Sequence, residues 1–171
     1  MGQNLDTVSL GLREIRRRKM AIYFYKVNDP YGCFSNFSPH PIEIAGYHWA
    51  TVEHYYQAQK FVNTKYEHII PVIRQASTPE IAAALGRDPA RQFRLDWEQV
   101  KCQIMYVAVK TKFLHHLNIQ AVLLETGEEF IVEDSPTDYY WGCGKEKTGQ
   151  NQLGRILMDV RREIRDNCAK S

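Results

Sequence analysis

The sequence has no long apolar run and no cysteine pattern that would define a metal site or a disulfide framework. Its apolar segments, such as QAVLLET, are far shorter than the roughly 18 residues that a membrane-spanning helix needs. The four cysteines lie far apart with no CxxC pair, unlike those of zinc sites or small secreted domains. We therefore expect no membrane span, no metal, and free thiols at Cys33, Cys102, Cys143 and Cys168.

The chain also has little net charge and no secretion signal. The formal net charge is +2, and residues 1–20 hold five basic and two acidic side chains, which leaves 17 basic and 18 acidic ones in the rest. A nearly neutral body is unlike a dedicated duplex-binding domain, whose phosphate contacts need a basic face. Because no apolar segment follows the basic start, we expect a cytoplasmic protein. We interpret residues 1–20 as a basic arm, with a solvated helix start or a frayed end as the alternative.

The size and composition of the chain indicate one folded domain. With 171 residues it is long enough for one hydrophobic core and too short for two ordinary domains. Hydrophobic residues make up 44% and charged residues 25%, which excludes disordered and fibrous classes. We place the domain at residues 21–168.

Local patterns predict an α+β fold that is predominantly α-helical, with a few short strands. Thr51, Thr78 and Asp96 each precede a helical pattern and are expected N-caps, while Gly86 and Gly127 are expected to end helices. The predicted helices cover residues 52–61, 63–77, 79–86, 97–116, 118–127 and 152–165. The predicted strands cover residues 21–27, 42–44, 47–49 and 129–134, with a hairpin turn at Gly46.

Two helical patterns carry further detail. In residues 63–77, Asn63 or Thr64 is the expected cap, and Pro71 either kinks the helix or begins a second one. The helical period also predicts which residues face the core. They are Val100, Ile104, Val107 and Ala108 in the long helix, and Leu153, Ile156, Leu157, Val160 and Ile164 in the last one.

The segment TVEHYYQAQKF, residues 51–61, holds unusually many groups that are costly to bury. Glu53, Gln57 and Lys60 share one helix face at the spacing i, i+4, i+7, while bulky or apolar residues occupy the rest of the circumference. Such a helix is expected to be surrounded by protein, so its polar face would point into a cavity. The alternative is an exposed Glu–Lys array that stabilises the helix by roughly 0.2 to 0.5 kcal/mol.

Three loops rich in polar and aromatic residues accompany this helix: GCFSNF, RLDW and DYYWGCG. Each has a plain structural interpretation. Asn36 can cap its own turn, Trp97 can anchor the core, and Gly142 and Gly144 can serve a tight turn.

Taken in order, several segments resemble those of the NADAR, or YbiA-like, family. They are GCFSNF (32–37), TVEHYYQAQKF (51–61), LGRD (85–88), DWEQVK (96–101), DYYWGCG (138–144) and GQNQLGRILMDVR (149–161). The resemblance runs from about residue 22 to about residue 165. It implies a compact helical fold that cleaves N-glycosidic bonds without a cofactor. The implied substrates are ribosylaminopyrimidine phosphates of the early riboflavin pathway, or ADP-ribose attached to guanine in nucleic acid.

The resemblance also assigns residues by position. Glu53 and Lys60 match the acid and the lysine of the family's helix, Trp97 matches its tryptophan, and Asp138 matches the acid before YWG. These four are the expected catalytic residues. The expected substrate-binding residues are Asn36, Phe37, Tyr56, Gln57, Trp141, Gly142 and Asn151. Cys143 stands where some relatives carry aspartate, and we assign it no chemistry.

These residue types suit the reaction. Breaking a C1′–N bond builds positive charge on the sugar and negative charge on the departing nitrogen. A carboxylate near the sugar can stabilise the first charge, and an acid near the base can stabilise the second. Which of Glu53 and Asp138 acts on the leaving group and which positions water stays open. Trp97 offers a face on which a base can stack.

Other groups have several interpretations. Lys60 is a phosphate contact, a Schiff-base nucleophile, or only an ion-pair partner of Glu53. The segment GCGKEKTGQNQLG, just before the last helix, is a candidate phosphate cradle. The histidines show no metal-ligand spacing.

The resemblance therefore implies an N-glycoside hydrolase that acts on a ribosylated nucleotide or on ADP-ribose, free or attached to nucleic acid. The alternative is a non-catalytic module that binds ADP-ribose or nucleotides.

Overall fold

The structure, a computed structural model, describes residues 21–169; the predicted basic arm at residues 1–20 lies outside the described residues. Its strands are β1 (Ala21–Phe24), β2 (Ile42–Ile44), β3 (Tyr47–Trp49) and β4 (Phe130–Glu133). Its α-helices are α2 (Val52–Gln59), α3 (Ile70–Arg74), α4 (Pro79–Gly86), α5 (Trp97–His115), α6 (Leu117–Glu125) and α7 (Gln152–Cys168). Two short 3-10 helices, η1 (Gly32–Phe34) and η2 (Glu67–Ile69), precede β2 and α3. The fold is the predicted mainly helical α+β arrangement.

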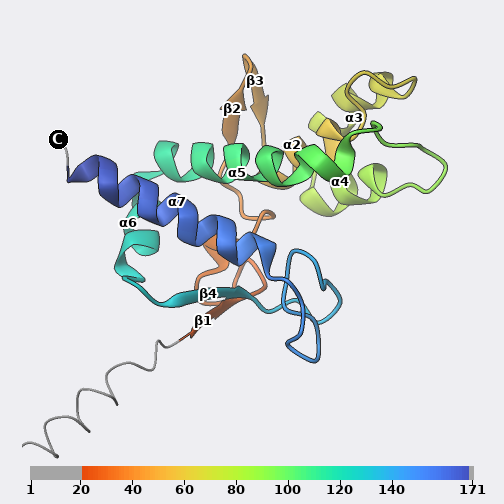
Figure 1. The fold of residues 1–171 in the computed structure, drawn as a ribbon. Coiled ribbons are helices and arrows are strands. Elements are labelled where there is room, and N and C mark those ends of the chain that lie inside the picture. Colours follow the sequence, from red (N-terminus) through yellow and green to blue (C-terminus); the bar gives the residue numbers. More distant parts are fainter. Residues whose placement is uncertain (1–20, 170–171) are drawn as a thin grey trace, which may run out of the picture.

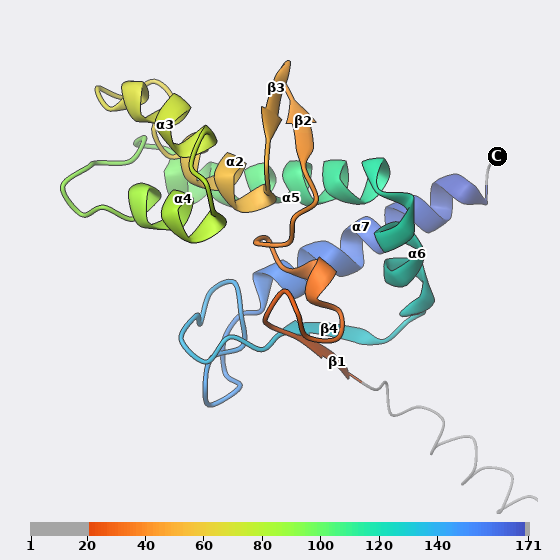
Figure 2. The same cartoon turned by 180° about the vertical axis from the view of Figure 1, so that it is seen from behind.

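The long helices α5 and α7 pack against each other at the centre (Figure 1). One side of α7 covers a two-stranded parallel sheet, in which Ala21 pairs with Phe130 and Phe24 with Glu133. The helix α2 packs between α5 and the pair α3 and α4. It lies beside the antiparallel hairpin β2–β3 (Figure 2). The hairpin turns through Ala45 and Gly46, which both have positive φ. The long loop after β4 returns to the start of α7.

Two of the three expected caps are confirmed. The Thr51 hydroxyl accepts from the amide of His54 at 3.4 Å, and the Thr78 hydroxyl accepts from that of Ile81 at 3.3 Å. Asp96 lies at the start of α5 but its side chain caps nothing. Its carboxylate instead binds the Arg94 guanidinium, with Oδ2 2.9 Å from Nη2. The Asp96 carboxylate therefore has an arginine as its partner and not an amide of the first helical turn.

The predicted helix over residues 63–77 is wrong in its first part. Asn63 has φ of 59°, and the Thr64 hydroxyl donates to the Phe61 carbonyl at 2.8 Å, so both residues build a turn. Helical structure begins only with η2, and Pro71 lies in the first turn of α3. Of the two interpretations of Pro71, the start of a second helical segment is confirmed.

The predicted inward face is confirmed for α7 and shifted for α5. All five α7 residues are buried. In α5, Ala108 is buried as predicted, whereas Val107 lies outside the core and Val100 and Ile104 are only partly buried. The buried stripe runs instead through Trp97, Met105, Ala108, Val109, Lys112 and Phe113. A fully buried lysine breaks the apolar pattern from which the face was predicted.

Further expectations concern the end of β1, the glycine after α6, the cysteines and membrane-spanning helices. β1 ends at Phe24 instead of residue 27, because the Asp29 amide donates to the Lys26 carbonyl in a turn. Gly127 follows α6 with φ of 58°, as a helix-ending glycine does. All four cysteines are free, as predicted. No helix of residues 21–169 is long and apolar enough to cross a membrane.

Gly86 ends α4 as expected, but packing explains the glycine better than backbone conformation does. Its φ is not positive. A Cβ at this position would lie 2.2 Å from Oε1 and 2.6 Å from Cβ of Gln57. The last turn of α4 therefore rests directly on α2, which only a residue without a side chain allows.

We predict that Gly86→Ala destabilises the protein. Although alanine has the higher helix propensity, the clash with Gln57 should lower the free energy of unfolding by roughly 1 to 3 kcal/mol. Chemical denaturation measures the change. The control is Ala84→Ser on the exposed face of α4, which should change stability little. A Gly86→Ala protein as stable as the wild type would show that α2 and α4 can separate without cost.

Candidate active site

A cavity of about 910 Å³ opens between α2, the loop after η1 and the segment that follows β4. This volume lies in the range of sites that enclose a small ligand. Eight of the eleven predicted site residues line it: Asn36, Phe37, Glu53, Tyr56, Gln57, Lys60, Asp138 and Trp141. The structure thus brings together residues that lie up to about a hundred positions apart in the chain.

The helix α2 is enclosed by protein. Every residue from Val52 to Ala58 is buried, and Glu53, Gln57 and Lys60 are 4%, 1% and 6% exposed. All three nevertheless line the cavity. This confirms that the polar face points into a cavity and excludes the exposed Glu–Lys array.

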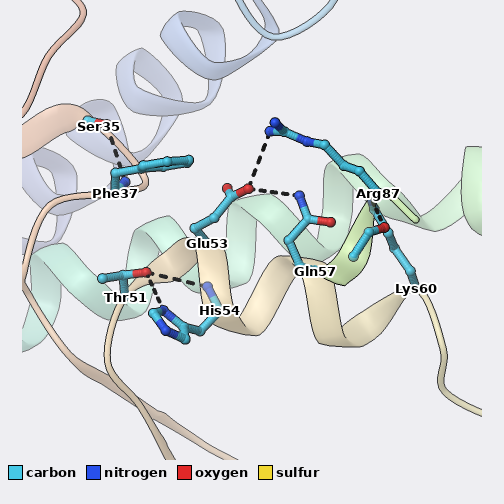
Figure 3. Close-up of polar contacts among 9 residues, drawn as sticks. Ser35, Phe37, Thr51, Glu53, His54, Gln57, Lys60 and Arg87 are labelled. Carbon is cyan, nitrogen blue, oxygen red and sulfur yellow. Dashed lines mark hydrogen bonds and ion pairs between the residues drawn. The ribbon is translucent and has the colours of Figure 1, made fainter. Parts of the chain in front are cut away.

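Glu53 is held by two partners (Figure 3). Its Oε1 accepts from the Gln57 side-chain amide at 2.7 Å and lies 3.5 Å from Nη2 of Arg87. Burial raises the pKa of Glu53, while the Gln57 hydrogen bond and the positive charges of Arg87 and Lys60 oppose that rise. Arg87 was not among the predicted site residues, although it belongs to the LGRD segment. An arginine directly after a helix that ends in glycine was the available signal.

Lys60 is shielded and has one hydrogen-bond acceptor. Its Nζ donates to the Gly86 carbonyl at 3.1 Å and lies 4.6 Å from the ring centroid of Phe93. The ion pair with Glu53 considered above is not formed. Burial lowers the pKa of Lys60 to about 8, with the negative charge of Glu53 opposing the fall. Part of this amine is therefore unprotonated near neutral pH.

Two more acids face the cavity opposite α2. Oδ1 of Asp138 accepts from the amides of Tyr140 and Trp141 at 2.9 and 2.7 Å, which fixes the carboxylate. Glu133, at the end of β4, was not predicted. Burial raises the pKa of Glu133 to about 8, and the negative charges of Asp138 and Glu53 add to the rise. Its only signal in the sequence was an acid at the end of an apolar strand.

The cavity also presents buried acceptors that have no hydrogen-bond partner among the residues that the structure describes. They are Oδ1 of Asn36, Oε1 of Gln57 and Oε2 of Glu133. Leaving a buried acceptor unsatisfied costs about 1 to 3 kcal/mol, so a ligand with hydroxyl or N–H groups would gain by binding here. Within residues 21–169, no three His, Cys, Asp or Glu side chains are arranged to hold a metal ion.

A buried lysine positions the loop that carries Asn36 and Phe37. Lys112 on α5 is 0% exposed, and its Nζ donates to the Cys33 carbonyl, the Ser35 carbonyl and the Ser38 hydroxyl at 2.8, 3.0 and 3.1 Å. The Glu53 amide donates to the Asn36 carbonyl at 3.1 Å. The loop is thereby fastened to both α5 and α2.

Three predicted site residues lie outside the cavity wall. Trp97 is 6% exposed and packs against Tyr56, with ring centroids 5.1 Å apart. Gly142 allows its backbone to approach that of Asp138 and Glu133, since a Cβ there would lie 3.0 Å from both carbonyl oxygens. Asn151 links the start of α7 to β4, as its side chain donates to the Ile131 carbonyl at 2.8 Å. All three support residues that do line the cavity.

The predicted phosphate cradle before α7 is wrong. The amides of Asn151, Gln152 and Leu153 donate to the carbonyls of residues 142, 140 and 141 at 3.0 to 3.1 Å. These N–H groups are therefore already bonded and cannot hold an anion. The cationic residues that line the cavity are Lys26, Lys60 and Arg87.

The part of the chain that matches one known protein family includes every residue that lines the cavity. The NADAR domain profile matches residues 23–165. Over 147 residues the chain is 64% identical to the N-glycosidase Npun_R5314 of Nostoc punctiforme, covering 86% of this chain and 94% of that protein. The NMR structure of Escherichia coli YbiA superposes with a TM-score of 0.81 at 41% identity, covering 90% of this chain and 89% of that one.

The chain is also similar to part of a larger protein. Over 155 residues it is 45% identical to the maize chloroplastic riboflavin biosynthesis protein PYRR. The match covers 84% of this chain and 25% of that protein. The common region is therefore one portion of the maize protein.

We predict that the titration of Lys60 reports the charge of Glu53. In protein labelled with ¹³C-lysine, the Lys60 resonance should titrate near pH 8. Glu53→Gln should move this pKa further down, because it removes a negative charge that stabilises the ammonium form. Glu43→Gln, on the exposed hairpin, is the control and should leave it unchanged. An unchanged pKa in Glu53→Gln would mean that the two groups are not coupled.

Proposed function

The chain belongs to the NADAR domain family, the family predicted from its sequence, and on this premise we propose that it is an N-glycosidase that hydrolyses the C1′–N bond of a ribosylated amine or base. Relatives of 64% and 44% identity are named N-glycosidases. The observation that carries the proposal is the meeting of Glu53 and Asp138 in one cavity, each with its carboxylate held by donors.

The two carboxylates have different roles in the reaction. Glu53, with Gln57 and Arg87 fixing its position, stabilises the positive charge that develops on C1′ and the ring oxygen. Asp138, oriented by two amides, accepts a proton from the attacking water, and such proton transfer contributes about 10²- to 10⁴-fold. The water oxygen bonds to C1′ as the C1′–N bond breaks. Once the departing nitrogen has taken up a proton, the products are the free sugar and the amine.

Several features support a free ribosylaminopyrimidine phosphate as the substrate. The maize relative is named a riboflavin biosynthesis protein. The cavity suits a ligand of nucleotide size, and its unpaired acceptors suit sugar hydroxyls and amino groups. Arg87, with its side chain 64% exposed, and Lys26 are available for the phosphate.

A second substrate, ADP-ribose attached to guanine in nucleic acid, is favoured by exposed rings at the cavity wall. Tyr25 and Tyr139 line the cavity and are 40% and 44% exposed. Rings of this kind stack on bases irrespective of sequence, with about 1 to 3 kcal/mol per base. An adenine or a flanking base would use them.

Lys60 has two hypothetical roles beyond opposing the rise in the pKa of Glu53. One is a phosphate contact, and the other is a Schiff base with the aldehyde of the opened sugar. The lowered pKa favours the Schiff base, because only the neutral amine attacks a carbonyl. Borohydride reduction during turnover would trap a stable adduct on Lys60 only in that case.

We predict that Glu53→Ala abolishes turnover while the fold remains, as circular dichroism would verify. The assay offers two substrates in parallel, the ribosylaminopyrimidine phosphate and guanine-ADP-ribosylated DNA. Release of ribose 5-phosphate from the first supports the metabolite role, and release of ADP-ribose from the second supports the nucleic-acid role. Glu43→Ala is the control and should be fully active. Undiminished turnover by Glu53→Ala contradicts its assignment, and wild-type protein that binds ADP-ribose but cleaves neither substrate would be a binding module.

A further inference from the structure

Neither Glu53 nor Asp138, in the roles proposed for them, supplies the proton that the departing nitrogen takes up. Amines and aminopyrimidines leave poorly as anions, so an acid near this atom would speed the reaction. We infer that Glu133 is a third catalytic carboxyl and protonates the leaving nitrogen. This inference rests on the proposed N-glycosidase function.

The backbone of Glu133 is held from two directions. Its amide donates to Oδ1 of Asn151 at 2.9 Å, and its carbonyl accepts from the Cys143 amide at 2.9 Å. Glu133 also closes the parallel pairing with Phe24. Its position is thus fixed by α7, by the loop before α7 and by β1 together, as a residue that must meet a substrate atom requires.

The Glu133 side chain differs from those of Glu53 and Asp138 in that no donor from residues 21–169 bonds its buried oxygen. Oε2 of Glu133 is buried and has no hydrogen-bond partner, whereas Glu53 has Gln57 and Arg87 and Asp138 has two amides. Glu133 is half-buried, and an ionised carboxylate is costly to hold partly out of water without partners. The pKa of Glu133, raised to about 8, agrees with a neutral carboxyl group near pH 7. Burial raises the pKa of Glu53 as well, but there the Gln57 hydrogen bond and the positive charge of Arg87 favour the ionised form, and nothing comparable acts on Glu133.

A neutral carboxyl supplies what the reaction lacks. As the C1′–N electron pair moves to nitrogen, the Glu133 proton goes to that nitrogen and Glu133 becomes a carboxylate. The water that bonds to C1′ gives its proton to Asp138. Exchange with solvent then returns a proton to Glu133 and removes one from Asp138, so that one water is consumed per turnover.

Two substitutions separate this role from a purely structural one. Glu133→Gln keeps size and shape but has no acidic proton, whereas Glu133→Asp keeps the acid on a shorter chain. We expect Glu133→Gln to lower kcat on the ribosylaminopyrimidine phosphate by about 10²- to 10⁴-fold with KM little changed. Glu133→Asp should retain more activity than Glu133→Gln. Glu43→Gln is the matched control. If Glu133→Gln is as active as Glu133→Asp or more so, the role is wrong.

A measurement on the wild type does not depend on how the variants fold. With ¹³C-glutamate labelling, the Glu133 carboxyl carbon should titrate near pH 8, in the field of Asp138, Glu53 and Cys143. A Glu133 carboxylate that is already ionised at pH 6 would overturn the inference. Failure of the proposed function looks different, since the wild type would then release no sugar from the substrate and the role of Glu133 would fall with it.

Discussion

The burial of a polar helix face is the constraint on which the rest of the structure depends. Glu53, Gln57 and Lys60 are all nearly inaccessible, and no core can accept them without partners. α4 supplies those partners at its end, through the Gly86 carbonyl and the Arg87 guanidinium, and the absence of a Gly86 side chain permits the approach. The packing of two helices and the charge balance of the cavity are thus one arrangement.

Features determined by neighbouring residues could be predicted from the sequence. Thr51 and Thr78 cap helices because their hydroxyls reach amides three residues ahead, and the apolar face of α7 follows the helical period. The buried face of α5 could not be predicted in the same way. Lys112 lies inside because carbonyls far away in the chain bind its ammonium group, and no local pattern contains that information.

The cavity, too, contains residues that a sequence pattern identifies and residues that only the structure identifies. Resemblance to known segments identified Glu53 and Asp138, and the structure brings them to one cavity. Glu133 carries no motif, since its importance comes from what surrounds it in space. The glycine-rich loop before α7 shows the converse. Its composition suggested an anion site, but carbonyls of residues 140–142 already bind its amides.

Asn151 gives the C-terminal helix a mechanical connection to the cavity. Its side chain binds both the carbonyl of Ile131 and the amide of Glu133, so two hydrogen bonds join the residue before α7 to the last residues of β4. A load applied to the far end of α7, by a fused domain or a surface attachment, would be transmitted along the helix to the strand that carries Glu133.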